Sequence, residues 1–245
     1  MTKPLQTKPK TMLVTGGSQG IGAGVTRAFL ERGYNVVANS RKITASELVP
    51  TEKLALVDGN IADPATAAKI VETAMSKFGS IDGVVNNAGI FMTKPFTDFT
   101  ADDLQMLSDT NLLGYVRLTQ LAVKQMLAQK TCGSVISITA TLADHPIAGV
   151  NASVSMITKA GLEGITRSLA MEYAKEGIRF NAVAPGIVDT PMHTSDPKDF
   201  LKRLSPMGVI VAVDDIVDAI LYLNDARYVT GEVLHVDGGA HTGKW

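Results

Sequence analysis

The feature that most constrains this chain is a glycine-rich turn that joins a short apolar strand to an amphipathic helix near the N-terminus. Residues 11–15 read TMLVT, which is typical of a buried strand, and apolar residues recur at helical spacing over residues 20–32. The turn between them contains Gly16, Gly20 and Gly22. Gly16 permits a tight turn, Gly20 lets the backbone approach a pyrophosphate at the helix N-terminus, and Gly22 lets the helix pack closely on the sheet. A turn in this context predicts a dinucleotide-binding unit.

The same alternation of short strands and longer helices continues along nearly the whole chain. The predicted strands are residues 11–15, 35–39, 54–57, 83–86, 134–139, 179–183 and 233–236, and the predicted helices are residues 20–32, 64–78, 101–129, 152–175 and 213–223. Strands that alternate with helices at this spacing are parallel and are joined by right-handed crossovers. The pattern predicts a single doubly wound, Rossmann-type α/β domain over residues 11–245, with helices on both faces of its sheet.

Composition and charge exclude several classes of protein. Lys and Arg total 23 against 24 Asp and Glu, and this balance favours neither a nucleic-acid partner nor a membrane surface. Cys132 is the only cysteine, so an intrachain disulfide is excluded, and we predict no metal site. Residues 1–10 hold three Lys, two Pro and no apolar run, which indicates a flexible tail rather than a signal peptide. Because no stretch approaches the ~20 apolar residues of a membrane span, we expect a cytoplasmic protein.

The end of the second predicted strand indicates which dinucleotide the turn selects. An NAD-selective site usually has an acidic residue here, which binds the ribose 2′-hydroxyl. This chain has Ser40 at that position, followed by Arg41 and Lys42. No carboxylate would repel a 2′-phosphate, and a guanidinium can bind one with two hydrogen bonds. We therefore predict NADP(H) in preference to NAD(H), although Arg41 and Lys42 are also compatible with solvated loop charges.

Several motifs in register resemble the short-chain dehydrogenase/reductase family over essentially the whole chain after the tail. They are residues 15–22, 60–63, 86–89, Asn111, residues 185–190 and residues 230–239. The resemblance implies a seven-stranded parallel sheet and a homo-oligomer, commonly a tetramer, with residues 101–129 and 152–175 at the subunit contacts. It also implies a small-molecule carbonyl or alcohol as the substrate.

The resemblance also assigns cofactor contacts beyond the first turn. It implies that Asn60 and Ile61 flank the adenine, that residues 86–89 support the nicotinamide ribose, and that residues 185–190 contact the carboxamide. Together with the turn and the 2′-phosphate position, the predicted cofactor-binding residues are Gly16, Ser18, Gln19, Gly20, Ile21, Gly22, Ser40, Arg41, Asn60, Ile61, Asn87, Ala88, Gly89, Lys159, Pro185, Gly186, Ile187 and Thr190.

The family's catalytic pattern is incomplete in this chain. Members use a Ser, a Tyr and a Lys, because the alkoxide that forms on hydride transfer needs a proton from a positioned acid. The tyrosine and the lysine stand four residues apart, which places both on one face of a helix. Lys159 matches the lysine, but Ser155 stands in the tyrosine position and Ala140 in the serine position. No Tyr-x-x-x-Lys occurs anywhere in the sequence.

Three interpretations follow. In the first, which we favour, the protein is an atypical NADP(H)-dependent oxidoreductase whose predicted catalytic residues are Asn111, Ser155 and Lys159, holding a water that donates the proton. His145 is a second possible donor, less favoured than an exposed loop histidine, and His193 is weaker still. In the second, the protein binds NADP(H) without redox chemistry, as a sensor or an assembly subunit. In the third, a family enzyme has been altered at residues 140 and 155.

The stretch around residues 186–207 interrupts the alternation of strands and helices. It is rich in proline and in mixed polar residues. Long insertions after a strand of an open α/β sheet lie at the carboxyl edge, where ligands bind. We interpret this stretch as a substrate lid, with an ordinary surface loop as the alternative.

Overall fold

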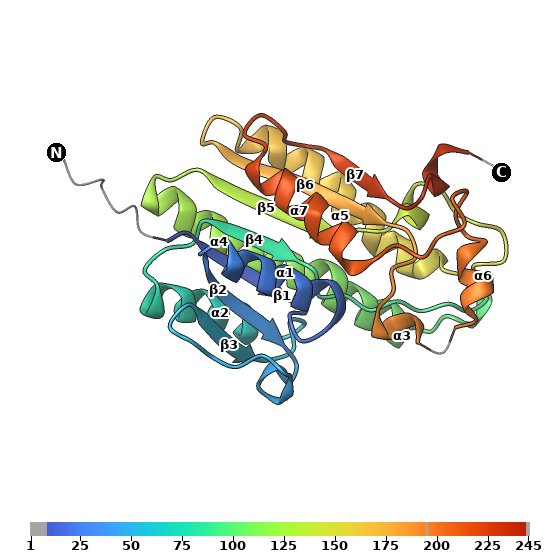
Figure 1. Cartoon of the computed structure of the whole chain (residues 1–245), viewed down its shortest axis with the longest axis horizontal. Helices are drawn as coiled ribbons and strands as arrows, with labels where there is room; N and C mark the ends of the chain where they lie inside the picture. The colour runs from blue at the N-terminus through green and yellow to red at the C-terminus, as the bar shows by residue number, and fades with distance from the viewer. Residues whose placement is uncertain (1–8, 195, 244–245) are drawn as a thin grey trace.

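A computed structural model describes residues 9–194 and 196–243 of the chain (Figure 1). It contains one sheet of seven parallel strands in the order β3-β2-β1-β4-β5-β6-β7. The strands are β1 (Thr11–Thr15), β2 (Asn35–Ser40), β3 (Leu54–Asp58), β4 (Gly83–Asn86), β5 (Gly133–Ile138), β6 (Ile178–Pro185) and β7 (Val233–Val236). The predicted fold class is therefore confirmed, and each predicted strand agrees with the structure to within two residues at either end.

Helices cover both faces of this sheet. They are α1 (Gly20–Glu31), α2 (Pro64–Lys77), α3 (Ala101–Leu107), α4 (Gly114–Gln129), α5 (Ser153–Glu172), α6 (Lys198–Lys202) and α7 (Val213–Asp225), with the short turns η1 (Ile43–Ala45), η2 (Phe96–Asp98), η4 (Thr141–Ala143), η5 (Pro191–His193) and η6 (Ala240–Thr242). The predicted continuous helix over residues 101–129 is instead divided by a π-helical turn, η3 (Ser108–Leu113). Such turns occur frequently at functional sites, and this one contains Asn111.

Alternation along each strand divides the core into two layers. In β1, Met12 and Val14 pack with α1 and α7 on one face, and Leu13 packs with α2, α4 and α5 on the other. Because the central strands β1, β4 and β5 are covered on both faces, their residues are buried throughout rather than alternately buried and exposed. The seven strands thus form the middle of a three-layer structure (Figure 1).

Two helix starts follow from capping residues in the sequence. Asp63 precedes α2, and its side chain accepts a hydrogen bond from the backbone N–H of Ala65 at 2.9 Å, while Pro64 occupies the first helical position. Thr100 and Asp103 form a reciprocal capping box at the start of α3. These caps fix where the crossover helices begin, and therefore where the preceding loops meet the carboxyl edge of the sheet.

The strand order reverses between β1 and β4, which are neighbours although two strands separate them in sequence. In open α/β sheets the ligand crevice lies outside the carboxyl ends of the strands at this point. All arrowheads point to the same edge, where α3, α6 and the C-terminal segment also gather (Figure 1). Residues 1–8 of the predicted tail lie outside the described residues. None of the helices within the described ranges is long and apolar enough to cross a membrane.

Candidate functional site

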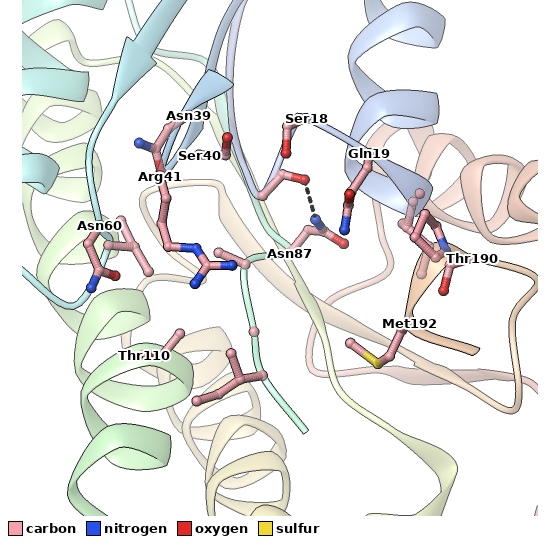
Figure 2. Close-up of a pocket in the computed structure, with 18 of the residues that line it drawn as sticks. Ser18, Gln19, Asn39, Ser40, Arg41, Asn60, Asn87, Thr110, Thr190 and Met192 are labelled. Carbon is pink, nitrogen blue, oxygen red and sulfur yellow. Dashed lines mark hydrogen bonds between the residues drawn. The ribbon is translucent and has the colours of Figure 1, made fainter. Parts of the chain in front are cut away.

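A cavity of about 310 Å³ opens at the carboxyl edge, where the strand order reverses (Figure 2). Its walls come from the loops after β1, β2, β3 and β4, from the turn η3 and from the segment that follows β6. The lining residues are Gly16, Ser18, Gln19, Gly20, Ile21, Asn39, Ser40, Arg41, Gly59, Asn60, Ile61, Asn87, Ala88, Gly89, Ile90, Met106, Thr110, Thr190, Pro191 and Met192. The volume falls at the lower end of the range typical of small-molecule sites.

The ends of β1 and β4 are joined by side-chain hydrogen bonds beneath the cavity. The Thr15 hydroxyl accepts from the backbone N–H groups of Asn87 and Ala88 at 3.1 and 3.0 Å. In return, the Asn87 amide donates to the carbonyl oxygens of Thr15 and Gly16 at 2.9 and 3.2 Å. These four bonds fix the glycine-rich turn against the loop after β4. The sequence motifs at residues 15–22 and 86–89 therefore form one structural unit.

The glycines of the first turn are required by geometry at two positions. Gly16 adopts φ +67°, in the left-handed region that favours glycine. At Gly22, a Cβ atom would lie 2.2 Å from the Gly16 carbonyl oxygen and 2.6 Å from the Asn87 amide nitrogen. Gly22 is therefore buried under the turn rather than exposed in the cavity, and its role is to let α1 approach the sheet.

The end of β2 brings a charged side chain to the cavity wall. Ser40 and Arg41 both line the cavity, and the Arg41 side chain extends into it between Asn60 and the loop after β4 (Figure 2). Among the described residues that line the cavity, Arg41 is the only one with a charged side chain. The nearby end of β3 does carry a carboxylate, Asp58. That carboxylate is occupied by the backbone N–H and hydroxyl of Thr44, whose hydrogen bonds hold its pKa below the ordinary value.

Asn111 and Lys159 converge on Gly89 at the opposite end of the cavity. The Asn111 Oδ1 atom and the Lys159 Nζ atom would each lie 3.3 Å from a Cβ on Gly89. A Cβ there would crowd both groups, and each would have to shift by a few tenths of an ångström. Asn111 is fixed by its own bonds: its Oδ1 accepts from the Ile90 N–H at 2.8 Å, and its Nδ2 donates to the Ile90 carbonyl and the Thr158 hydroxyl, each at 3.0 Å.

Lys159 projects from α5 towards the end of β5, where its ammonium donates to the Ile138 carbonyl oxygen at 2.8 Å. Burial lowers the pKa of this lysine to about 8, because the charged form loses solvation. An ammonium with this pKa can release a proton close to neutral pH, which an ordinary lysine does only far above it.

The two positions that are predicted to depart from the family's catalytic pattern, Ala140 and Ser155, differ in their surroundings. Ser155 is fully buried, and its hydroxyl donates to the Met92 carbonyl at 2.9 Å while accepting from the Met92 N–H at 3.0 Å. The hydroxyl therefore fastens the segment after β4 to the start of α5. The role of Ser155 in catalysis remains a prediction, and the observed contacts are structural ones.

The hydroxyls of the two threonines beside Ala140 are both engaged in hydrogen bonds. Thr139 donates to the Val183 carbonyl at 3.2 Å, and Thr141 donates to the Ala184 carbonyl at 3.2 Å and to the Asp237 carboxylate at 2.9 Å. Both threonines are buried. Their hydroxyls are directed towards β6 and the C-terminal segment.

Three other candidate proton donors lie in distinct places. Tyr115 borders a much smaller cavity beside Asn111, but burial raises the pKa of its phenol to about 12, which makes it a poor acid. His193 is paired with Asp196 at 2.8 Å in the segment after β6. His145 is exposed in the loop after β5, with its ring 5.8 Å from that of His241.

Comparison with known proteins places this geometry in a family. A family model described as enoyl-(acyl carrier protein) reductase matches residues 16–241. A solved structure described as a short chain dehydrogenase/reductase family protein is 33% identical, with a TM-score of 0.87 and coverage of 96% of this chain and 98% of the other. The chain belongs to the short-chain dehydrogenase/reductase family.

Proteins similar to this short-chain dehydrogenase/reductase include named oxidoreductases and proteins whose structures contain a bound nucleotide. The 3beta-hydroxysteroid dehydrogenase 1 of Eggerthella lenta is 35% identical over 246 residues, which cover 95% of this chain and 94% of the relative. The structure of ElxO with NADP bound is 28% identical, with a TM-score of 0.86 and coverage of 96% and 100%. A 3-ketoacyl-(acyl-carrier-protein) reductase from Brucella melitensis complexed with NADH is 29% identical, with a TM-score of 0.88 and coverage of 95% and 98%.

Most of the predicted cofactor-binding residues of this family member line the cavity. The exceptions are Gly22, Lys159 and residues 185–187 at the end of β6. Gly22 packs against the carbonyl of Gly16, and Lys159 lies behind Gly89, which does line the cavity. Within residues 185–187, Gly186 is packed against Asp237, where a Cβ would lie 2.9 Å from the backbone. Sequence reasoning missed the lining residues Asn39, Gly59, Ile90, Met106, Thr110, Pro191 and Met192.

Proposed function

We propose that this protein is an NADP(H)-dependent oxidoreductase that interconverts a small carbonyl compound and its alcohol with a non-standard proton donor. The proposal rests on the cavity where the strand order reverses. Arg41 lines one end of this cavity, and Gly89, which lies beside Lys159, lines the other end. Bound NADPH would supply the hydride. The protein must bind and orient the nucleotide, exclude water and deliver a proton.

Nucleotide binding follows from the residues along the cavity wall. The backbone at the start of α1, after Gln19, offers N–H groups to the pyrophosphate. Arg41 would bind the 2′-phosphate, and no carboxylate stands at Ser40 to repel it. These two features support NADP(H) over NAD(H). Asn60 and Ile61 would border the adenine, and residues 87–89 would border the ribose of the nicotinamide.

Proton delivery rests on Lys159 and Asn111. With a pKa of about 8, Lys159 is mostly protonated at pH 7 and still close enough to titration to act as an acid. We infer that a water between the two side chains carries its proton to the substrate oxygen. Ser155 contributes by holding the Met92 segment in place beside them. This arrangement needs no tyrosine.

The alternative is a protein that binds NADP(H) without turnover. It is favoured by one set of observations: Ala140 offers no hydroxyl, and the hydroxyls of Thr139, Thr141 and Ser155 are all engaged with backbone or Asp237 oxygens. The position of Lys159 beside Asn111 and Gly89 favours the oxidoreductase, because it places a proton donor at one end of the cavity.

We further propose that residues 11–245 act as one nucleotide-binding domain and that residues 186–207 are a substrate lid. Thr190, Pro191 and Met192 from this segment line the cavity, and a Cβ on Gly20 would lie 3.2 Å from the Thr190 methyl carbon. The lid therefore meets the glycine-rich turn across the cavity. We also propose a homo-oligomer with α4 and α5 at the subunit contacts.

The test is NADPH oxidation followed by absorbance, with ketosteroids, 3-oxoacyl thioesters, aldoses and quinones as substrates. Oxidation beyond one equivalent per chain, and its loss in Lys159→Met with NADPH still bound, would support the oxidoreductase and the proton route. Saturable NADPH binding with no oxidation of any compound would support the binding protein instead. Turnover that survives in Lys159→Met at an unchanged pH profile would refute the role given to the lysine.

A further inference from the structure

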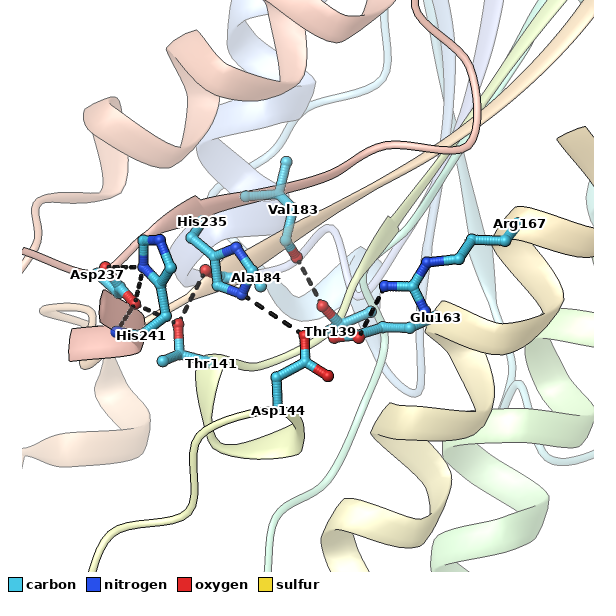
Figure 3. Close-up of polar contacts among 10 residues, drawn as sticks. All are labelled: Thr139, Thr141, Asp144, Glu163, Arg167, Val183, Ala184, His235, Asp237 and His241. Carbon is cyan, nitrogen blue, oxygen red and sulfur yellow. Dashed lines mark hydrogen bonds and ion pairs between the residues drawn. The ribbon is translucent and has the colours of Figure 1, made fainter. Parts of the chain in front are cut away.

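Three of the four histidines of the chain converge near the carboxyl ends of β5 and β7. Figure 3 shows two of them, His235 and His241, beside Asp144. His145 follows β5, His235 lies on β7 and His241 lies in η6. The rings of His235 and His241 are stacked with centroids 4.1 Å apart, and the ring of His145 is 6.1 Å from that of His235. No short spacing in the sequence brings these residues together. The parallel sheet does so, because the segments after β5 and β7 emerge at the same edge.

Potential metal-binding atoms from three residues meet in this cluster. One carboxylate oxygen of Asp144 and one ring nitrogen each of His145 and His235 all lie within 4.8 Å of one another. The His235 Nε2 atom is buried without a hydrogen-bond partner, 3.7 Å from the Asp144 carboxylate. A buried polar atom left unpaired is rare and calls for an explanation such as a missing ion. Because Asp144 and His145 are exposed on a loop, small side-chain movements can close the three atoms around one ion.

Like the His235 Nε2 atom, the Glu163 carboxylate beside the cluster has no hydrogen-bond partner among the described residues. The Glu163 side chain is 2% exposed, and neither of its oxygens accepts a hydrogen bond within the described residues. Its nearest cation, Arg167, is 3.7 Å away and largely exposed. A cation bound at Asp144 would place a positive charge near this buried carboxylate, which has no hydrogen-bond partner among the described residues.

The remaining members of the cluster orient the ring of His235. The Asp237 side chain is 2% exposed and accepts hydrogen bonds from the Thr141 hydroxyl, the Gly239 N–H, the His241 N–H and the His241 Nδ1. Asp237 thereby fixes the His241 ring, which lies flat against the His235 ring. Stacking on this fixed ring restrains the ring of His235.

We propose that Asp144, His145 and His235 bind one divalent transition-metal ion of the zinc type. Two imidazoles and one carboxylate suit zinc, cobalt or nickel, whereas magnesium and calcium prefer oxygen ligands. Three protein ligands leave a fourth position for water or another ligand. The site is built from the loop that follows Ala140 and does not share residues with the lining of the nucleotide cavity. Its occupation does not depend on the function proposed above.

Calorimetric titration of untagged, chelator-treated protein with zinc chloride tests this site. We expect one zinc ion per chain, and a rise in melting temperature with zinc that an equal concentration of magnesium does not produce. In His235→Ala and in Asp144→Asn, zinc affinity should fall by about 100-fold, because loss of even an outer contact costs roughly 10–100-fold. Asp144 is exposed, so its variant tests the site without disturbing the core.

His193→Ala is the matched control, because His193 is the fourth histidine of the chain and is paired with Asp196 away from the cluster. Its zinc affinity should equal that of the wild type. Cobalt should give the visible absorption of a four-coordinate ion in the wild type and in His193→Ala only. The proposal is overturned if the wild type binds no zinc, or if Asp144→Asn and His235→Ala bind it as tightly as the control.

Discussion

Gly22→Ala should destabilise the protein and weaken NADPH binding together. The added Cβ would lie 2.2 Å from the Gly16 carbonyl oxygen and 2.6 Å from the Asn87 amide nitrogen, and the first of these is a backbone atom. Overpacking of this kind costs about 1–3 kcal/mol in free energy of unfolding. For a chain of 245 residues, where each kcal/mol lowers the melting temperature by about 2–4 °C, that is a loss of roughly 2–12 °C. NADPH affinity should fall with it, because the displaced turn forms the cavity wall.

Gly164→Ala provides the matched control, since it makes the same change within α5 where nothing lies within 4 Å of the added Cβ. There alanine should raise the free energy of unfolding by up to about 1 kcal/mol through its better helix propensity. The two variants should be compared by thermal unfolding, followed by calorimetric titration with NADPH at a temperature where both are folded. If Gly22→Ala melts at or above the wild-type temperature and binds NADPH equally well, the close approach of α1 to the turn is not what the glycine provides.

Three further predictions concern single side chains. Arg41→Ala should weaken NADPH binding by about 10–100-fold, which is the contribution of a charge-assisted pair, and should change the affinity for NADH by less than about twofold. Arg27→Ala, which removes an exposed arginine on α1, should change neither affinity. Equal losses of affinity for both nucleotides would refute the assignment of Arg41. Lys159 has a pKa of about 8 when folded against an ordinary 10.5, so the unfolded chain binds more protons between these values and wild-type stability rises with pH across that window. Measured by urea unfolding across this window, the free energy of unfolding of the wild type should rise by up to about 3 kcal/mol relative to that of Lys159→Met. Parallel curves of stability against pH for the two proteins would contradict this prediction. Ser155→Ala should lower the free energy of unfolding by about 1–3 kcal/mol by leaving the Met92 backbone groups unpaired, with turnover per folded protein retained; a stable variant without turnover would place the hydroxyl in the proton route instead.

The sequence was sufficient for the fold because local signals agreed with the tertiary structure. Each strand of the sheet is a short segment with a buried apolar centre, and caps such as Asp63 mark the helix starts. The glycine-rich turn was predictable for the same reason, since Gly16 needs a positive φ and Gly22 has no room for a side chain. Agreement between local propensity and global packing is what makes such inferences reliable.

Other features depend on contacts between distant segments, which periodicity does not reveal. The π-helical turn at Asn111 interrupts a pattern that reads as one continuous helix. The Ser155 hydroxyl looked available for chemistry, but its partners come from the Met92 backbone, 63 residues away. The cluster of Asp144, His145 and His235 has no spacing motif, because its parts meet only at the edge of the folded sheet. Sequence reasoning for this reason predicted no metal site.

The most direct test of the account is a side-by-side calorimetric titration of the wild-type protein with NADPH and with NADH. We expect one site per chain and at least about 10-fold tighter binding of NADPH, because Arg41 lines the cavity where no free carboxylate opposes a 2′-phosphate. Equal affinities, or tighter binding of NADH, would contradict the assignment of the cavity as an NADP(H) site.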